Sequence, residues 1–145
     1  DEFRVIHNNN SKPLIPVFIS NSIPPYNPST NPSVRTFSYD DNYEIDNYYE
    51  YWLNLDYSNY AKTPIWSQYD FTSLYGIPDL TLNSLIKLVD RFMNEDDLFQ
   101  IYYQAFYCFP AKYAKCNNNK PSYCKKSLIC PILNVADEQY ERCII

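Results

Sequence analysis

The sequence predicts an α+β protein in which strands come first and helices follow. Two features of the apolar pattern indicate this order: short apolar runs and alternations in the front part fit strands, and spacings of three and four in the rear part fit amphipathic helices. A third feature is that four of the five cysteines fall within residues 116–143. We therefore predict a β-rich segment over residues 1–57 and a helical, cysteine-containing subdomain over residues 58–145.

The front part contains four expected strands, three short and one long: residues 3–7, 14–19, 34–39 and 43–55. Pro16 places the second strand at a sheet edge or a bulge, because proline cannot donate to the ladder. Residues 20–33 are rich in proline, asparagine and serine and predict a loop. A meander of so few strands has open edges when it stands alone, so we expect these strands to complete a sheet that begins elsewhere.

The rear part contains five expected helices: residues 63–76, 81–93, 94–106, 121–130 and 134–143. The first begins with Thr63 and Pro64, residue types of an N-cap and a first turn, and ends at Gly76. The second begins at Thr81, after which apolar residues recur on one side. The acidic run Glu95-Asp96-Asp97 falls at the start of the third helix, where carboxylates favour the helix dipole, so we assign it to capping rather than catalysis.

The single glycine and single histidine exclude several chemistries. A phosphate-binding glycine loop needs two or three glycines, and a histidine-rich metal centre needs more than His7. The net charge of −5 argues against binding to a nucleic acid polymer. No stretch approaches the roughly 20 apolar residues of a transmembrane segment. No nucleophile, base and electrophile come together in the pattern, so we predict that the chain alone is inactive and binds no metal.

The C-terminal cysteines predict disulfides rather than zinc ligands. Zinc sites usually pair cysteines two to four residues apart, and no such close pair exists here. Pairing of neighbours in the sequence predicts the disulfides Cys116–Cys124 and Cys130–Cys143. Cys108 is then left over, either as a buried free thiol or with a partner outside this chain.

Two other features have structural as well as functional interpretations. The acidic residues between Asp40 and Asp56 lack the ordered spacing and the glycine of an EF-hand loop, so we interpret them as a solvated face. The aromatic run from Tyr48 to Trp52 resembles a stacking platform, but its acidic neighbours favour a packed sheet face.

A single glycosylation sequon at Asn9, together with the disulfides, predicts secretion. The chain has no signal peptide and no initial methionine, so we expect a mature product or a piece of a longer chain.

Several short segments share their order and spacing with one enzyme family. They are Asp1-Glu2-Phe3, Lys12-Pro13-Leu14, Asn31-Pro32-Ser33, Tyr49 to Leu55, Trp66, Leu74 to Leu80, Asp97-Leu98-Phe99-Gln100 and the C-terminal cysteines. Together they resemble the C-terminal portion of acid sphingomyelinase and the acid-sphingomyelinase-like phosphodiesterases. In that family the Asp-Glu-Phe sequence directly follows a Gly-His-Thr-His metal-binding motif.

The resemblance implies a parent enzyme of the calcineurin-like metallophosphodiesterase class, with two zinc ions whose ligands precede Asp1. This chain would then extend the sheet of that upstream catalytic domain and line one side of the substrate cleft, in a secreted or lysosomal enzyme. By position, Phe18, Tyr26 and Asn27 resemble residues of the family's cleft, although Tyr26 is equally well explained as an ordinary loop tyrosine.

The resemblance also suggests two substrates. Sphingomyelin, hydrolysed to ceramide and phosphocholine, is the first expectation, and a nucleotide or other small phosphodiester is the second. A secreted, disulfide-linked binding module without catalysis is the alternative from a different functional class.

Overall fold

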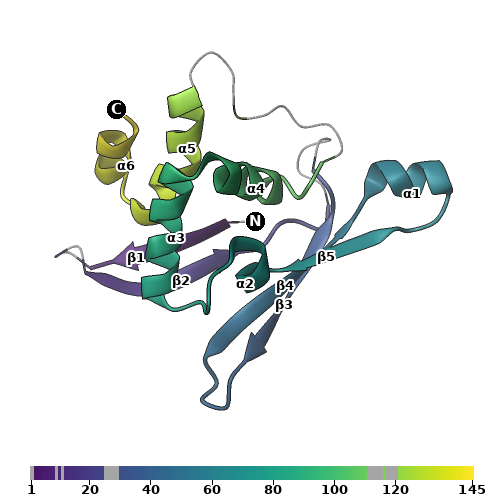
Figure 1. The fold of residues 1–145 in the computed structure, drawn as a ribbon, viewed down its shortest axis with the longest axis horizontal. Coiled ribbons are helices and arrows are strands. Elements are labelled where there is room, and N and C mark those ends of the chain that lie inside the picture. The colour runs from purple at the N-terminus through teal and green to yellow at the C-terminus, as the bar shows by residue number, and fades with distance from the viewer. Residues whose placement is uncertain (1, 9, 11, 25–29, 111–115, 117–120) are drawn as a thin grey trace. The chain divides into compact units, whose positions relative to one another are not determined.

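The computed structural model describes residues 2–8, 10, 12–24, 30–110, 116 and 121–145. In this part of the chain, strands form small antiparallel sheets and helices follow them, which confirms the α+β class (Figure 1). The residues group into two compact units, each made of segments distant in the sequence. The sheet unit comprises Ser20–Leu80 and Gln104–Tyr113, and the hairpin unit comprises Glu2–Ile19, Thr81–Tyr103 and Ala114–Ile145. The predicted domain division between residues 57 and 58 stays a prediction.

The sheet unit is built on three antiparallel strands in the order β3-β4-β5. They are β3 (Ser33–Tyr39), β4 (Ile45–Leu53) and β5 (Trp66–Asp70), with α1 (Leu55–Ala61) between β4 and β5 and α2 (Phe71–Tyr75) directly after β5. Aromatic side chains form its core. Tyr48, Phe71 and Tyr75 are all buried, and the ring of Phe71 lies 4.7 Å from that of Tyr48 and 4.6 Å from that of Tyr75. Aromatic pairs at this spacing contribute beyond their buried area.

The helix predicted over residues 63–76 is wrong over most of its length. Residues 66–70 form β5 instead, and β5 pairs with β4 along its full length. Ladder hydrogen bonds to a strand that is distant in the sequence outweigh a local helical spacing of apolar residues. Only the end was predicted correctly: Asp70 caps α2 through its side chain, and Gly76 ends it with a φ of 60°, which suits glycine.

The long strand predicted over residues 43–55 is also shorter than expected. β4 ends at Leu53 and α1 begins at Leu55. The side chain of Asn54 accepts a hydrogen bond from the backbone N–H of Tyr57 at 3.1 Å and so caps α1. No residue of α1 is buried, so the helix lacks the apolar periodicity that would have revealed it in the sequence.

The hairpin unit packs helices against a two-stranded sheet. Its strands are β1 (Glu2–His7) and β2 (Pro13–Ile19), and its helices are α3 (Leu82–Asn94), the first part of α4 (Asp96–Phe106), α5 (Pro121–Leu133) and α6 (Asp137–Ile144). β1 contacts α3 and α5, β2 contacts α3, and α5 contacts α6. The predicted amphipathic helix after Thr81 is confirmed: Leu85, Leu88 and Phe92 of α3 are fully buried, and Phe92 stacks on Tyr102 of α4 at 4.6 Å.

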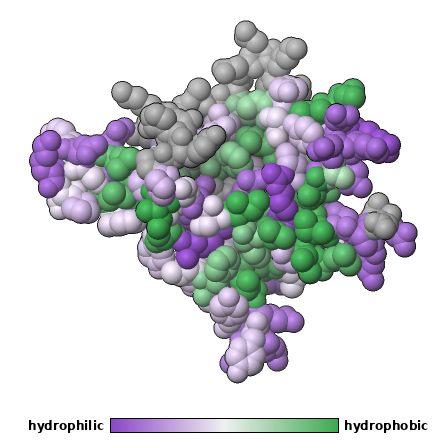
Figure 2. Space-filling model, turned by 180° about the vertical axis from the view of Figure 1, so that it is seen from behind, coloured by the Kyte–Doolittle hydropathy of each residue, from purple (hydrophilic) through white to green (hydrophobic). Residues whose placement is uncertain are grey.

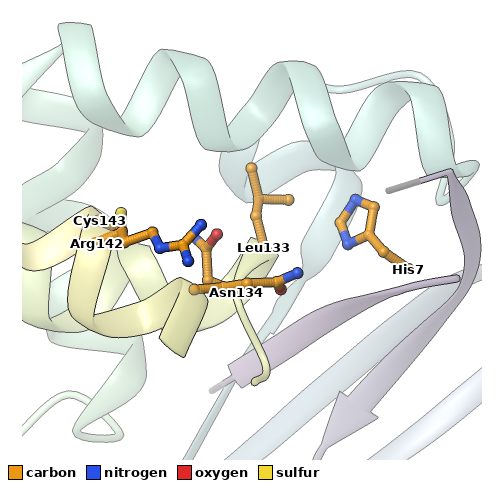
Figure 3. A pocket seen from close by; sticks show the side chains of 6 residues that line it. His7, Leu133, Asn134, Arg142 and Cys143 are labelled. Atoms are coloured by element: carbon orange, nitrogen blue, oxygen red, sulfur yellow. The ribbon is translucent and has the colours of Figure 1, made fainter. Parts of the chain in front are cut away.

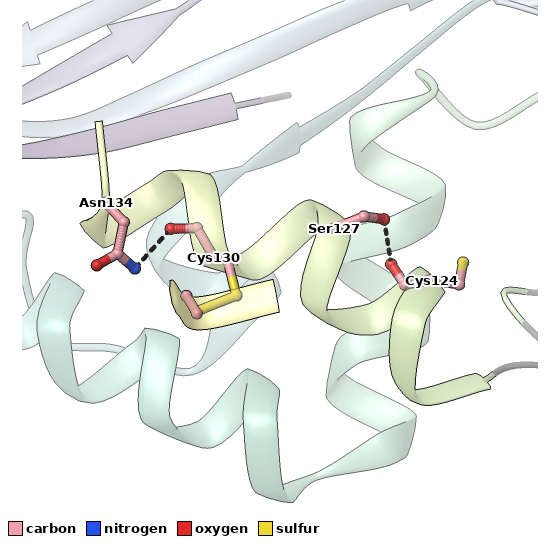
Figure 4. Close-up of a disulfide and its surroundings, with 5 residues drawn as sticks. Cys124, Ser127, Cys130 and Asn134 are labelled. Atoms are coloured by element: carbon pink, nitrogen blue, oxygen red, sulfur yellow. Dashed lines mark hydrogen bonds between the residues drawn. A yellow bond between two sulfur atoms is a disulfide. The ribbon is translucent and has the colours of Figure 1, made fainter. Parts of the chain in front are cut away.

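Two disulfides cross-link the helical end of the chain. They join Cys116 to Cys124, with the Cα atoms 5.8 Å apart, and Cys130 to Cys143, with the Cα atoms 5.7 Å apart. Both are the neighbour pairs that the spacing predicts. Figure 4 shows the second disulfide holding α6 against α5, beside the hydrogen bond from Asn134 to the carbonyl of Cys130. No described helix is long and apolar enough to cross a membrane.

Candidate functional site

The three predicted cleft residues fall in the front of the chain, and the structure describes one of them. Phe18 lies on β2 directly opposite Phe3 of β1 and is half-buried. Tyr26, Asn27 and the predicted glycosylation site Asn9 lie outside the described residues. The structure therefore does not bring the three cleft residues together, and their roles stay predictions.

The ends of the proline-rich segment that contains Tyr26 and Asn27 are held in place. The backbone N–H of Ser33 donates to the carbonyl of Ser22 at 3.5 Å. Asn31 is buried, and its side-chain N–H group donates to the carbonyls of Cys108 and Phe109 at 3.0 and 2.9 Å. Its side-chain oxygen accepts from the backbone N–H of Leu55 at 3.1 Å. One buried amide thus satisfies three backbone groups from two other segments.

A buried charged pair lies next to this anchor. Arg35 of β3 and Glu50 of β4 are cross-strand partners, and both side chains are only 1% exposed. Arg35 Nε donates to Glu50 Oε2 at 2.7 Å, and Ser33 Oγ donates to Glu50 Oε1 at 2.5 Å. The guanidinium also lies 4.0 Å from the centre of the Tyr48 ring. The carboxylate therefore has a partner on each oxygen and the cation has a carboxylate and a ring.

The surroundings of this cluster raise the pKa values of Arg35 and of the Cys108 thiol. Burial lowers the pKa of Arg35, but Tyr48 and Glu50 raise it more, so its pKa lies above the ordinary value. Burial raises the pKa of the Cys108 thiol above its ordinary value, although hydrogen bonding to Ser33 and Asn21 lowers it in part. A nucleophilic cysteine needs a lowered pKa, so Cys108 is suited to a structural role as a buried free thiol.

The acidic runs are engaged in turns, caps and ion pairs. Asp40 accepts hydrogen bonds from the backbone N–H groups of Asn42 and Glu44, both at 2.9 Å, and so closes the turn between β3 and β4. Glu95 pairs with Arg91 at 2.9 Å, and Asp96, in the first turn of α4, pairs with Lys125 at 2.7 Å.

A zinc centre does not fit this arrangement. Within the described ranges, no group of three or more histidine, cysteine, aspartate and glutamate side chains is placed to hold a metal ion. Four of the cysteines are used in disulfides, and the carboxylates named above already have hydrogen-bond partners. We therefore derive no chemical step through a metal bound to this part of the chain.

The sequence reasoning missed the cluster of Asn31, Arg35 and Glu50. A signal was present: Glu50 is the single carboxylate of the aromatic run from Tyr48 to Trp52, and Arg35 is the only cation of the preceding strand. Charged residues at such positions are rarely buried unless they are paired. The partner, however, depends on the strand register, which the sequence pattern did not specify.

The features now described define a disulfide-linked α+β region with a buried polar cluster. Residues 10–145 match the family described as the acid sphingomyelin phosphodiesterase C-terminal region. The chain belongs to this family, and the resemblance found in the sequence is confirmed.

Curated relatives agree with this assignment. The chain is 30% identical over 152 aligned positions to the cyclic GMP-AMP phosphodiesterase SMPDL3A of Rattus norvegicus. This alignment covers 99% of this chain and 33% of that protein. It is 28% identical to the Homo sapiens protein of the same name over the same shares. The acid sphingomyelinase-like phosphodiesterase 3b of Homo sapiens is 29% identical over 113 positions, which are 71% of this chain and 25% of that protein. The chain thus spans about a quarter to a third of the length of these relatives.

Proposed function

We propose that the chain is the non-metal-binding C-terminal part of a secreted or lysosomal zinc-dependent phosphodiesterase. In this proposal it braces the upstream catalytic domain, which holds the zinc ions, and lines one side of the substrate cleft. The observation that carries the proposal is that the β1–β2 sheet has one face covered by helices, whereas β2 presents exposed apolar side chains on the other.

The two faces differ in the residues that they present. Because side chains alternate along a strand, Phe3 and Val5 of β1 share a face with Phe18 of β2, and these three side chains are buried or half-buried. The opposite face of β2 presents Ile15, Val17 and Ile19, which are 56, 37 and 40% exposed. Their cross-strand neighbours on β1 are Ile6 and the ion-paired Arg4 and Glu2. Figure 2 shows hydrophobic side chains at the surface on the side where the β1–β2 hairpin lies. We call Ile15, Val17 and Ile19 the exposed β2 face.

The exposed β2 face supports an occupant from the same protein. A two-stranded sheet is marginally stable on its own, and it gains most from further strands or a second packed layer. β1 and β2 pair only with each other among the described strands. The relatives are three to four times as long as the matched region, so the upstream catalytic domain is the occupant that we propose.

The relatives also bear on the substrate. Two substrates were expected, sphingomyelin first and a nucleotide phosphodiester second. Relatives that match 99% of the chain carry the name cyclic GMP-AMP phosphodiesterase. This supports a nucleotide phosphodiester as the first candidate for the parent enzyme, with sphingomyelin as the second. On their positions alone, Phe18, Tyr26 and Asn27 remain the proposed cleft residues.

Activity of the full-length protein tests the catalytic part of the proposal. We expect hydrolysis of cyclic GMP-AMP that is lost after zinc is chelated, and slower or no hydrolysis of sphingomyelin. The 145-residue chain alone is expected to be inactive. Activity of the chain alone, or inactivity of the full-length protein toward both substrates, would refute the proposal.

The docking surface is tested by charge substitutions on the exposed β2 face. Ile15→Lys with Val17→Lys places two cations where we propose a buried contact, and we expect secretion and activity of the full-length protein to fall about tenfold or more. Val135→Lys is the matched control, because Val135 is also exposed (53%) but lies in the connection between α5 and α6. Secretion and activity equal to the wild type in the double variant would show that this face is not a docking surface.

A non-catalytic binding module makes a different prediction for the isolated chain. It requires that residues 2–19 are as strongly protected from hydrogen exchange as the helices. Our proposal predicts weak protection there and strong protection in α3 and α4, because the strands lack their cover.

A further inference from the structure

A pocket in the hairpin unit combines residues from both ends of the chain. It has a volume of about 490 Å³ and is lined by His7 at the end of β1, Leu133 and Asn134 at the end of α5, and Gln139, Arg142 and Cys143 of α6. Figure 3 shows His7 and Arg142 approaching it from opposite sides, with Leu133 and Asn134 between them. The volume falls within the range of small-molecule sites, which is about 300–1,000 Å³.

The pocket has one fixed cation among its polar groups. Arg142 contributes a guanidinium, Asn134 and Gln139 contribute amide groups, and His7 contributes an imidazole. Among the described residues no carboxylate lines the pocket. The acidic residues of α6, Asp137, Glu138 and Glu141, are outside the lining. A guanidinium in a lining without a carboxylate recognises an anion in preference to a cation.

Arg142 is available to a ligand. It forms an ion pair with Glu138, one helical turn away, at 3.9 Å between Nη2 and Oε2. This distance is too long for a hydrogen bond, and both side chains are more than 80% exposed. An exposed pair of this kind contributes little, so a bound oxyanion can compete for the guanidinium at small cost.

The second disulfide lies at the wall of the pocket. Cys143 forms part of its wall and is bonded to Cys130 of α5. Asn134 is fixed at the same place, because its side-chain N–H group donates to the Cys130 carbonyl at 2.9 Å (Figure 4). The disulfide thus holds Gln139 and Arg142 of α6 opposite His7 of β1. The other link of α6 to α5 is packing, and no residue of α6 is buried.

We propose that this pocket binds the phosphate group of a small molecule, and that binding requires the Cys130–Cys143 disulfide. The forked guanidinium of Arg142 suits the paired oxygens of a phosphate. Gln139 supplies a neutral donor beside it, and Leu133 offers an apolar wall for the rest of the ligand. This site is independent of the phosphodiesterase role proposed above, because none of its residues belongs to the predicted cleft.

The test uses the full-length protein and inorganic phosphate as the probe. Hydrogen exchange is followed in peptides that cover α6 and the end of β1, in phosphate and in chloride at equal ionic strength. We expect phosphate to slow exchange in these peptides, and sulfate to do the same. In Arg142→Gln we expect the phosphate concentration needed for half of the protection to rise about tenfold, as for loss of one charge-assisted pair.

Matched variants separate a specific site from a general salt effect. Lys87→Gln removes an exposed cation of α3 that does not line the pocket, and it should bind phosphate like the wild type. Cys130→Ser with Cys143→Ser should lose the protection, whereas Cys116→Ser with Cys124→Ser should keep it. Phosphate protection that is absent, or that is the same in Arg142→Gln as in the wild type, would overturn the proposal. Protection retained without the Cys130–Cys143 disulfide would overturn its second part.

Discussion

The sheet unit buries charge, whereas the hairpin unit is held by apolar packing and disulfides. The buried polar and charged residues Asn31, Ser33 and Glu50 all belong to the sheet unit. Both disulfides belong to the hairpin unit, and its core consists of apolar and aromatic side chains such as Leu85, Leu88 and Phe92.

The two units therefore fix their structures in different ways, one by a buried charged pair and the other by disulfides. The charged pair in the sheet unit has one satisfactory arrangement, because a shift of register by one residue would move one of the two side chains to the opposite face and leave the other charge without its partner. It fixes β3, which follows the proline-rich segment, against β4. Apolar contacts have no fixed partner of this kind, so the hairpin unit tolerates more variation in its core. Its two disulfides restrict the C-terminal helices.

The largest effect is expected when one charge of the buried pair is removed. Glu50→Leu leaves the Arg35 guanidinium buried without its carboxylate, and we expect the free energy of unfolding of the sheet unit to fall by about 4 kcal/mol. Urea unfolding, combined with hydrogen exchange in β3 and β4, measures the loss. The double variant Arg35→Met/Glu50→Leu removes both charges and should regain most of the stability. A loss below about 1 kcal/mol in Glu50→Leu would show that the pair is not buried in solution.

A smaller effect, confined to the other unit, is expected when a disulfide is removed. Cys130→Ser with Cys143→Ser should lower stability by about 3 kcal/mol, and Cys116→Ser with Cys124→Ser by about 2.5 kcal/mol, because the sequence separations are 13 and 8 residues and a longer loop loses more entropy. Hydrogen exchange should rise in α5 and α6 and stay unchanged in β3–β5. An equal rise in both units would contradict the contrast between them.

The smallest effect is expected from the pH dependence of one cap in the sheet unit. Burial raises the pKa of Asp70, but hydrogen bonds from Ser73, Asn47 and Thr72 lower it more, so its pKa lies below the usual 3.8. A depressed pKa means that the carboxylate stabilises the folded state fully above the ordinary pKa, and that this contribution is lost as the pH falls through the lower folded value.

Asp70→Asn keeps a capping side chain but removes the charge. The wild type should therefore be more stable than the variant at pH 6, and the difference should shrink as the pH falls below about 4. Thermal unfolding between pH 2.5 and 7 measures it. Asp56→Asn, at an exposed position of α1, is the control. A stability difference that is constant with pH would mean that the charge of Asp70 contributes nothing.

Local patterns were sufficient wherever the structure is local. The helix after Thr81, the end of α2 at Gly76 and both disulfide pairs follow from spacing within about a dozen residues, since caps, helical faces and short loops are formed by neighbours. The first three strands were also found near their predicted positions. The resemblance to the phosphodiesterase family rests on the same short segments, and the family match confirms it.

Contacts between distant segments were decided only by the tertiary structure. Residues 66–70 have a helical spacing, yet they pair with β4 because unsatisfied backbone groups of that strand are close to them. The partnership of Arg35 with Glu50 depends on the register of β3 and β4, and the hydrogen bonds of Asn31 depend on where α4 ends. The pocket between His7 and Arg142 requires that the first strand and the last helix meet. Sequence periodicity shows which side of an element is apolar, but it does not show which other element packs against that side.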